Sequence, residues 1–258
     1  MKNNMKISIA IATYNEQENI TRCLEAVDSF ASEIIIVDGQ SSDDTVSLAK
    51  KFKKVKVIST TNKPIFHINK QMAIEACSSD WILQLDADEV VTQELQREII
   101  STIESNPTEN GFWINRKNFF LGKFLTKGGI YPDATIRLYR NGKGKLPCLD
   151  VHEQASIDGN IGHLTQDLLH FSDPNFSRYL LRSDRYTSLL ASQLLQEGVT
   201  VTKINFIRYF VVKPISWFVL AYFRHRGYVD GFPGFVFAWY SALRFPIAYI
   251  KLYEKQKN

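Results

Sequence analysis

Four short apolar runs, separated by segments of helical spacing, constrain the fold of this chain most. We expect buried strands at residues 6–13, 33–37, 55–59 and 81–85. We expect helices at residues 15–27, 41–52 and 67–77. Strands that alternate with helices of this length predict an α/β fold with a parallel, doubly wound sheet. In such a sheet, ligands bind beyond the carboxyl ends of the strands.

Polar residues follow three of these strands. Tyr14 comes after the first strand, Asp38 ends the second, and Asp86 with Asp88 ends the fourth. Because the carboxyl ends of parallel strands meet at one edge, we expect these side chains to converge. Asp86, Asp88 and Glu89 would repel one another unless a cation lay between them, and a hard divalent ion prefers oxygen ligands. The alternatives are a solvated acidic turn and, for Glu89, the start of the next helix.

Two helices carry capping signals. Asn15 with Glu18 predicts a capping box at the start of the first helix. Ser41 with Asp44 predicts the N-terminal cap of the second helix. Residues 111–140 have shorter apolar runs with glycines, which indicates an irregular or antiparallel segment packed on the sheet.

The last 58 residues differ in composition from the rest. Residues 201–258 carry nine Lys and Arg against Asp230 and Glu254, which gives a net charge of +7. The whole chain has a net charge of +4, so the rest of it is slightly negative. Sixteen of the 32 aromatic residues also lie there. We therefore expect two parts, residues 1–200 and residues 201–258, that meet different surroundings. Three cysteines at unrelated spacings suggest neither a disulfide framework nor a zinc site, and a reducing compartment is expected.

Four motifs, taken in order along the chain, resemble one family. They are the segments 12–16 (Ala-Thr-Tyr-Asn-Glu), 37–45, 85–89 (Leu-Asp-Ala-Asp-Glu) and 151–153 (Val-His-Glu). Together they resemble glycosyltransferase family 2, whose members have the nucleotide-sugar-binding GT-A fold. The segments 131–138 and 230–254 are similar to those of bacterial lipopolysaccharide-core β-glucosyltransferases. The resemblance implies inverting, metal-dependent transfer of a hexose, glucose above all, from a UDP-sugar to a lipid-linked or core saccharide.

The resemblance assigns roles to individual residues. The nucleotide-binding set that it implies is Thr13, Tyr14, Glu16, Asp38, Ser41, Lys70 and Asp86. A carboxylate and an aromatic face suit the N–H group and the ring of a pyrimidine, although Asp38 as a turn residue and Tyr14 as a packing residue remain alternatives. The implied ligands of Mg²⁺ or Mn²⁺ are Asp88, Asp86 and His152.

The remaining assignments concern the base and the anion contacts. Glu153 is the candidate general base, and Asp150 competes with it. Arg116, Arg137 and His170 are candidates for phosphate or acceptor contacts, and each has a structural role as its alternative.

Basic residues interrupt the apolar helices at 206–223 and 234–253. No run of about 18 uncharged apolar residues occurs there, so we expect no spanning helix. Amphipathic helices at the cytoplasmic face of an anionic membrane are expected instead, with an internal hairpin or a homo-oligomer contact as alternatives. Nucleic-acid binding is disfavoured, because the aromatics lie in long helical runs.

Two other functions compete with glycosyl transfer. A nucleotidyltransferase that forms nucleotide sugars can share this sheet, but segment 12–16 lacks the glycine-rich basic loop that would hold a triphosphate. A non-catalytic membrane- or sugar-binding scaffold would not need the acidic residues of the motifs.

Overall fold

The computed structural model describes residues 5–148, 154–173 and 175–257. The chain packs into two units. The first, here called the sheet unit, comprises residues 1–116 and 133–170, and the second, the helical unit, comprises 117–132 and 171–258. The helical unit therefore begins earlier than residue 201, where composition changes, and it includes a loop from the middle of the sequence.

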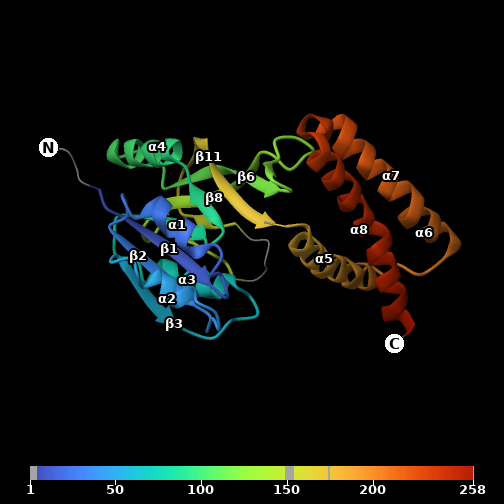
Figure 1. Cartoon of the computed structure of the whole chain (residues 1–258), viewed down its shortest axis with the longest axis horizontal. Helices are drawn as coiled ribbons and strands as arrows, with labels where there is room; N and C mark the ends of the chain where they lie inside the picture. The colour runs from blue at the N-terminus through green and yellow to red at the C-terminus, as the bar shows by residue number, and fades with distance from the viewer. Residues whose placement is uncertain (1–4, 149–153, 174, 258) are drawn as a thin grey trace. The chain divides into compact units, whose positions relative to one another are not determined.

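The central feature of the described chain is a sheet of nine strands in the order β3-β2-β1-β4-β8-β6-β11-β5, with β7 on β6 (Figure 1). Its strands are β1 (Ile7–Thr13), β2 (Glu33–Asp38), β3 (Val55–Ser59), β4 (Trp81–Asp86), β5 (Glu89–Val91), β6 (Gly111–Phe120), β7 (Lys123–Phe124), β8 (Asp133–Arg140) and β11 (Ile161–Asp173). Strands β1 to β4 are parallel, as predicted. Strands β8, β6 and β11 add antiparallel pairs, so residues 111–140 are antiparallel as expected, but they extend the sheet itself instead of packing on it. A separate pair consists of β9 (Gly144–Lys145) and β10 (Ser156–Ile157).

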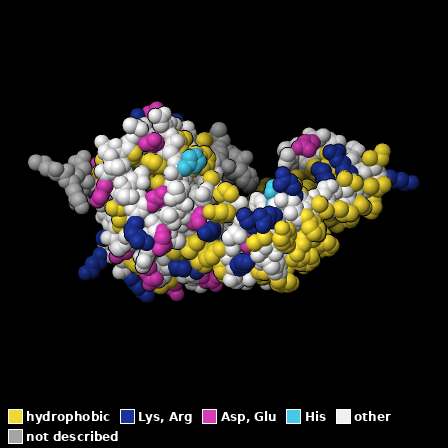
Figure 2. All heavy atoms as spheres, turned by 90° about the horizontal axis from the view of Figure 1, so that it is seen from above, with side chains coloured by type: hydrophobic (Ala, Val, Ile, Leu, Met, Phe, Trp, Pro, Cys, Tyr) yellow, Lys and Arg dark blue, Asp and Glu magenta, His cyan; other side chains and the backbone are white. Residues whose placement is uncertain are grey.

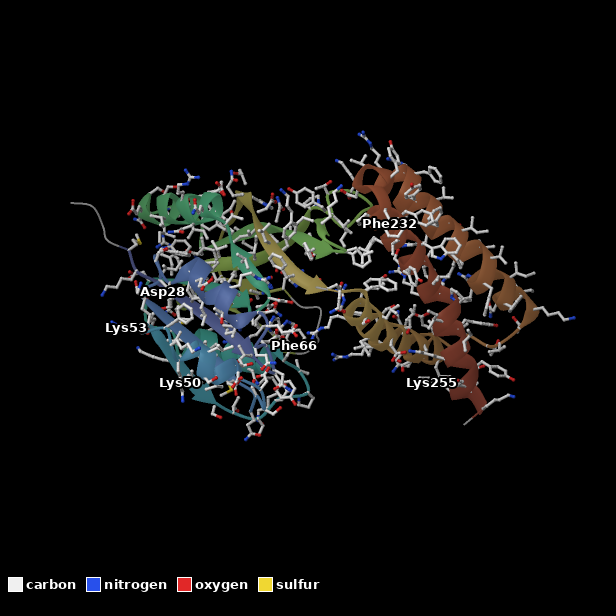
Figure 3. All side chains as sticks on the ribbon, viewed as in Figure 1. Asp28, Lys50, Lys53, Phe66, Phe232 and Lys255 are labelled. Carbon is white, nitrogen blue, oxygen red and sulfur yellow. The ribbon has the colours of Figure 1, made fainter. Side chains whose placement is uncertain are left out.

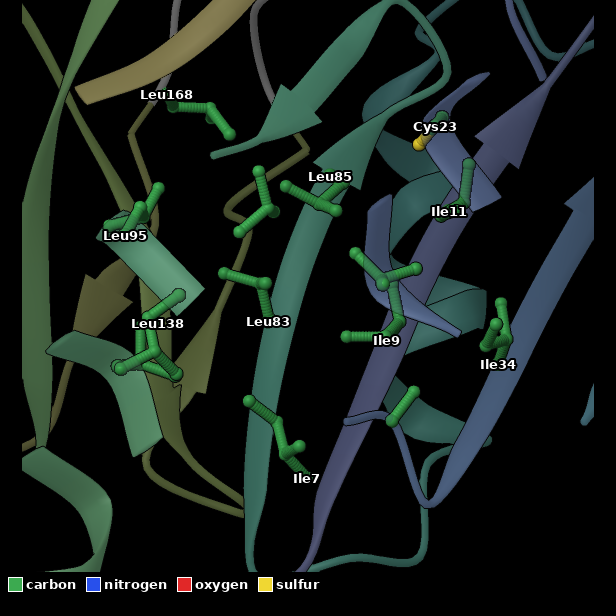
Figure 4. Packing of buried hydrophobic residues seen from close by; sticks show 14 of the residues in the cluster. Ile7, Ile9, Ile11, Cys23, Ile34, Leu83, Leu85, Leu95, Leu138 and Leu168 are labelled. Carbon is green, nitrogen blue, oxygen red and sulfur yellow. The ribbon is translucent and has the colours of Figure 1, made fainter. Parts of the chain in front are cut away.

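Helices cover both faces of the parallel strands because successive side chains point to opposite sides. The helices of the sheet unit are α1 (Ile20–Val27), α2 (Thr45–Ala49), α3 (His67–Glu75) and α4 (Gln93–Glu104). Ile9 and Ile11 pack with α1, α2 and α4, whereas Ala10 packs with α3 on the other face. Figure 4 shows the first of these clusters, where Leu83 and Leu85 of β4 lie beside Ile9. Both faces of the parallel strands are therefore buried against helices.

Both predicted helix caps are wrong. Asn15 has a left-handed backbone (φ 56°), and its Oδ1 accepts a hydrogen bond from the Ser42 amide at 2.8 Å, so α1 begins only at Ile20. Ser41 bonds to Asp38 instead, and α2 starts at Thr45 and ends at Ala49. In both cases the polar side chain joins two loops at the strand edge rather than starting a helix.

The helical unit consists of one long helix and a helical hairpin. Its elements are α5 (Phe176–Gln196), α6 (Lys203–Ile207), η1 (Arg208–Val212), α7 (Lys213–Phe218), η2 (Val219–Arg224), η3 (Gly227–Asp230) and α8 (Gly231–Lys257). A buried cluster joins Phe120, the last residue of β6, and Leu125, which follows β7, to Tyr179 of α5 and Val236 of α8. The predicted helices at 206–223 and 234–253 are confirmed in type and are longer than expected.

The continuous helix Lys203–Arg224 is long and apolar enough, by length and composition, to cross a membrane. The expectation of no spanning helix rests on the basic residues that interrupt this segment, and it stays a prediction, because length and composition do not distinguish a spanning helix from an interfacial one. Only 11% of the most apolar window of this helix is buried inside the protein.

Asp230 connects the hairpin to the loop 117–132. Its carboxylate is buried and accepts hydrogen bonds from the amides of Thr126 (2.9 Å) and Lys127 (2.8 Å) and from Thr126 Oγ1 (2.9 Å). Lys123 Nζ lies 3.6 Å from the same carboxylate. These charge-assisted bonds hold together two segments about a hundred residues apart in the sequence.

Candidate active site

The carboxyl ends of β1, β2 and β4 bring the predicted residues together. Thr13 lies opposite Asp38 in the β1–β2 register, and Ala12 lies opposite Asp86 in the β1–β4 register. Thr13 Oγ1 donates a hydrogen bond to Asp38 Oδ1 at 2.9 Å. The expected convergence at one edge of the sheet is therefore confirmed.

Asp38 is held in a fixed orientation. Ser41 donates to it through its amide (2.9 Å, to Oδ2) and through its hydroxyl (2.6 Å, to Oδ1). The Asn15 amide in turn donates to Ser41 Oγ at 2.9 Å, which ties the loop after β1 to the loop after β2. Tyr14, which lies between Thr13 and Asn15 in the sequence, is 47% exposed, so part of its aromatic ring is accessible to a ligand. The Glu16 amide donates to Thr45 Oγ1 at 2.8 Å, which also holds this loop.

Asp86 is surrounded by cations. One of its oxygens forms an ion pair with Lys70 of α3, and the other lies 2.7 Å from Arg137 Nη2 of β8. Burial alone would raise the pKa of Asp86, but the charges of Arg137 and Lys70 hold it well below its usual range. Burial also lowers the pKa of Lys70, although the Asp86 carboxylate partly opposes this. Asp86 is therefore ionised and already neutralised by the protein.

Glu89 lies under this turn and not at the start of a helix. It belongs to β5 and is completely buried, and α4 begins later with Thr92 as its N-cap. Its carboxylate accepts from the Asp86 amide at 2.9 Å and from Arg137 Nη2 at 2.6 Å. Arg116 Nη1 lies 3.3 Å from the same carboxylate. Glu89 thus orients the loop that carries Asp88.

Both arginines proposed as anion contacts face carboxylates. Arg137 bonds to Gln84, Asp86 and Glu89. Arg116 Nη2 is 2.8 Å from Asp133. In this arrangement both arginines position the acidic turn, and a bound anion would have to compete with these carboxylates.

Asp88 pairs with His170, at 3.4 Å between Oδ2 and Nε2. The antiparallel pairing of β11 with β5 sets His170 opposite Glu89 and so beside Asp88. Burial would raise the pKa of Asp88, but the hydrogen bond from His170 lowers it. Burial would lower the pKa of His170, and the Asp88 carboxylate raises it instead. The sequence gives no signal for this contact, because it depends on a strand pairing between segments about eighty residues apart.

The residues present fit a divalent metal ion. Asp88 is partly exposed and supplies a carboxylate oxygen, the donor that Mg²⁺ and Mn²⁺ prefer, whereas His170 Nε2 donates to Asp88 and therefore orients this carboxylate rather than serving as a second ligand. Asp86 is a poorer ligand here because Lys70 and Arg137 already occupy its oxygens. Within the described ranges, no three His, Cys, Asp or Glu side chains gather into a ligand set. An ion at Asp88 would therefore depend on diphosphate oxygens as well, as Mg²⁺ commonly does.

Asp150, His152 and Glu153 lie outside the described residues. Gln154, which follows them, is fixed on β8: its Oε1 accepts from Thr135 Oγ1 at 3.0 Å and from the Ile136 amide at 3.2 Å. These positions adjoin Arg137, which contacts Asp86. The chain therefore returns to the acidic edge immediately after the candidate base.

Comparison with known proteins identifies the class of this site. The model of glycosyl transferase family 2 matches residues 8–153, which include the four segments 12–16, 37–45, 85–89 and 151–153. The chain belongs to glycosyl transferase family 2, and it is a glycosyltransferase with the GT-A fold.

Similar proteins match along nearly the whole chain. A lipopolysaccharide core biosynthesis glycosyltransferase, LpsC of Rhizobium meliloti, is 28% identical over 256 residues, which cover 97% of this chain and 93% of that protein. An uncharacterized glycosyltransferase of Rickettsia typhi is 28% identical and covers 90% of this chain and 81% of its own. Among solved structures, residues 1–349 of Staphylococcus aureus TarS in complex with UDP superpose with a TM-score of 0.52. That match has 14% identity and covers 98% of this chain and 92% of the other, so it supports the fold alone.

Proposed function

We propose that this enzyme transfers a hexose, with glucose as the first candidate, from a UDP-sugar to a lipid-linked lipopolysaccharide-core saccharide. The transfer would invert the anomeric carbon, require Mg²⁺ or Mn²⁺, and occur at the cytoplasmic face of the membrane. The observation that carries the proposal is the strand edge where the rigidly held Asp38 carboxylate and the Asp86–Asp88 turn follow strands β2 and β4, which both pair with β1. The similarity to LpsC supports the acceptor class, and the UDP and UDP-GlcNAc complexes of TarS, which share the fold, are consistent with a uridine nucleotide.

The binding half of the reaction follows from the geometry. Asp38 would accept a hydrogen bond from the pyrimidine N–H group, and the open ring of Tyr14 would lie against the base or the ribose. Lys70 and Arg137 cancel the charge of Asp86, so the edge repels a diphosphate less than its acidic sequence suggests. Asp88 would hold the metal ion, which would supply positive charge against the leaving diphosphate.

The chemical half depends on a base at the end of the motif 151–153. Glu153 would remove the proton from an acceptor hydroxyl, which then attacks the anomeric carbon opposite the diphosphate. Asp150 is the alternative base. Family membership decides against the nucleotidyltransferase and the scaffold as alternatives.

The decisive test is the substitution Asp88→Asn. We expect Mn²⁺-dependent binding of UDP to disappear in calorimetry and turnover to fall by about 10²-fold or more, because the side chain would hold the ion. The melting temperature without ligand should change little, since Asp88 is partly exposed.

Asp80→Asn is the matched control. Asp80 precedes the same strand at the opposite edge, where its carboxylate accepts from the Lys6 amide. This variant should bind UDP with the same metal dependence as the wild type. Unchanged turnover in excess EDTA, or an Asp88→Asn enzyme of normal activity, would refute the metal assignment.

A further inference from the structure

The helical hairpin of residues 203–257 exposes an apolar stripe on each of its two helices. On the first helix the stripe consists of Ile204, Ile207, Val211, Ile215, Val219 and Phe223, at intervals of three or four residues. Ile204 is 80% exposed and Ile215 is 59% exposed. On α8 the stripe consists of Phe232, Phe235, Trp239, Ile247 and Ile250, and Phe232 is 72% exposed (Figure 3). Figure 2 shows hydrophobic side chains gathered over this helical part.

The cations in the middle of the hairpin turn away from these stripes. Lys213 Nζ lies 4.2 Å from the ring centre of Tyr209, which is buried. The Arg244 guanidinium lies 3.9 Å from the ring of Trp217. Lys251 Nζ bonds to Asp184 of α5 at 2.7 Å. The exposed face is therefore free of these three charges, as a face in contact with hydrocarbon would require.

The basic residues that do face solvent lie toward the ends of the first helix. Lys203 and Arg208 are exposed at its beginning, and Arg224 and Arg226 are exposed at its end. Lys203, Arg224 and Arg226 thus lie at the two ends of the apolar stripe, and Arg208 lies within its first turns, one helical turn after Ile204; long side chains of this kind reach lipid phosphates. Of the two acidic residues in 201–258, Asp230 is buried. The surface is therefore complementary to an anionic membrane.

The packing of α5 distinguishes a helix lying on the membrane from one that crosses it. Buried Leu194 of α5 packs with Tyr249 and Leu252 of α8, and the Lys251–Asp184 contact lies beside them. Helix α5 also carries exposed charges, which would enter the hydrocarbon if α8 crossed the bilayer with it. Lying in the plane of one leaflet avoids that cost.

We propose that the two stripes form one surface that binds an anionic phospholipid bilayer, with both helices in the plane of the interface. This surface deepens the proposed function, because it would bring the enzyme to the membrane that holds a lipid-linked acceptor. Only this link to the acceptor rests on the proposed function. The exposed stripes themselves are a property of the helical unit.

Vesicle flotation tests the surface. The whole enzyme should float with vesicles of about one-third phosphatidylglycerol in phosphatidylcholine, and less at high salt. The double variant Ile215→Glu with Val219→Glu should lower the partition coefficient by about two orders of magnitude, because two apolar contacts become repulsive. Both side chains are exposed, so folding should persist.

The control variant carries the same change of charge elsewhere. Ile58→Glu with Ile161→Glu alters two exposed isoleucines of the sheet unit and should bind vesicles like the wild type. Equal flotation of the two double variants, or a wild type that buries the stripes by self-association and ignores vesicles, would overturn the proposal.

Trp239 reports the depth. Its side chain is 47% exposed on the α8 stripe, so the fluorescence difference between the wild type and Trp239→Phe isolates its signal. Phospholipids brominated near the headgroup should quench that signal more than phospholipids brominated near the end of the acyl chain. The reverse order would show a spanning helix instead.

UDP binding, measured in the same preparations, separates this proposal from the catalytic one. A wild type that binds vesicles but no UDP would leave the surface standing and remove the transferase assignment.

Discussion

At the scale of single residues, the proposed reaction depends on the side chain that removes a proton from the acceptor hydroxyl. The two acidic candidates for its removal, Asp150 and Glu153, differ by three positions in the sequence. Glu153→Gln is nearly isosteric and should lower turnover by roughly 10²–10⁴-fold, the usual contribution of a positioned base. Binding of the donor should change little, because neither residue is assigned to the nucleotide. Steady-state kinetics with separate calorimetry of UDP binding would measure both effects.

Asp150→Asn is the companion variant. We expect it to lose less than about fivefold in turnover, which would leave it outside the proton transfer. A large loss for Asp150→Asn together with a small loss for Glu153→Gln would exchange the two roles.

Residues at the ends of strands were predictable, whereas their partners were not. Asp38 and Asp86 follow from the rule that parallel strands present their carboxyl ends at one edge. The cations on Asp86 come from α3 and β8, and the histidine on Asp88 comes from β11. Strand β11 joins the sheet by antiparallel pairing at long sequence separation, and periodicity carries no information on such a pairing.

At the scale of elements, strands were predicted better than helix starts. An apolar run between polar residues specifies a buried strand almost by itself. A polar residue before a helix can bind another loop instead, as Asn15 binds Ser42, and then the helix begins later. Local sequence does not decide between these two partners.

Strand β2 is anchored by a buried carboxylate whose pKa predicts a dependence of stability on pH. Burial alone would raise the pKa of Glu33, but hydrogen bonds from Lys56, Ser78 and Ser8 lower it from 4.5 to about 2. The ionised form therefore stabilises the folded state above about pH 4.5, and this contribution is lost as the pH falls toward 2. Glu33→Gln should cost about 2 kcal/mol of unfolding free energy at pH 7, and the difference from the wild type should shrink to about 1 kcal/mol near pH 4.

Urea unfolding at a series of pH values would measure this difference. Glu94→Gln is the control, because Glu94 forms an exposed pair with Arg97 and should cost less than about 0.5 kcal/mol at any pH. A difference for Glu33→Gln that stays constant from pH 7 to pH 4 would contradict the lowered pKa.

On the scale of the whole molecule, the C-terminal helices are part of a buried core. Val236 of α8 covers Phe120, Leu125 and Tyr179. Deletion of residues 204–258 would expose this cluster to water, so we expect the truncated protein to bind a hydrophobic dye and to aggregate. A truncation that ends at Tyr253 keeps Val236 and should remain soluble. A soluble, monomeric deletion mutant that binds no dye would show that the cluster does not need the hairpin.

Asp230 has a consequence for how relatives of this enzyme can be recombined. Its carboxylate is bonded to Thr126 and Lys127, about a hundred positions earlier. A chimera that exchanges only the C-terminal helices would pair this loop with a foreign partner and leave the two amides without this acceptor. Exchange of residues 117–132 together with 171–258 keeps the bonded pair intact. The transferable module of this enzyme is therefore encoded in two separate stretches of its gene.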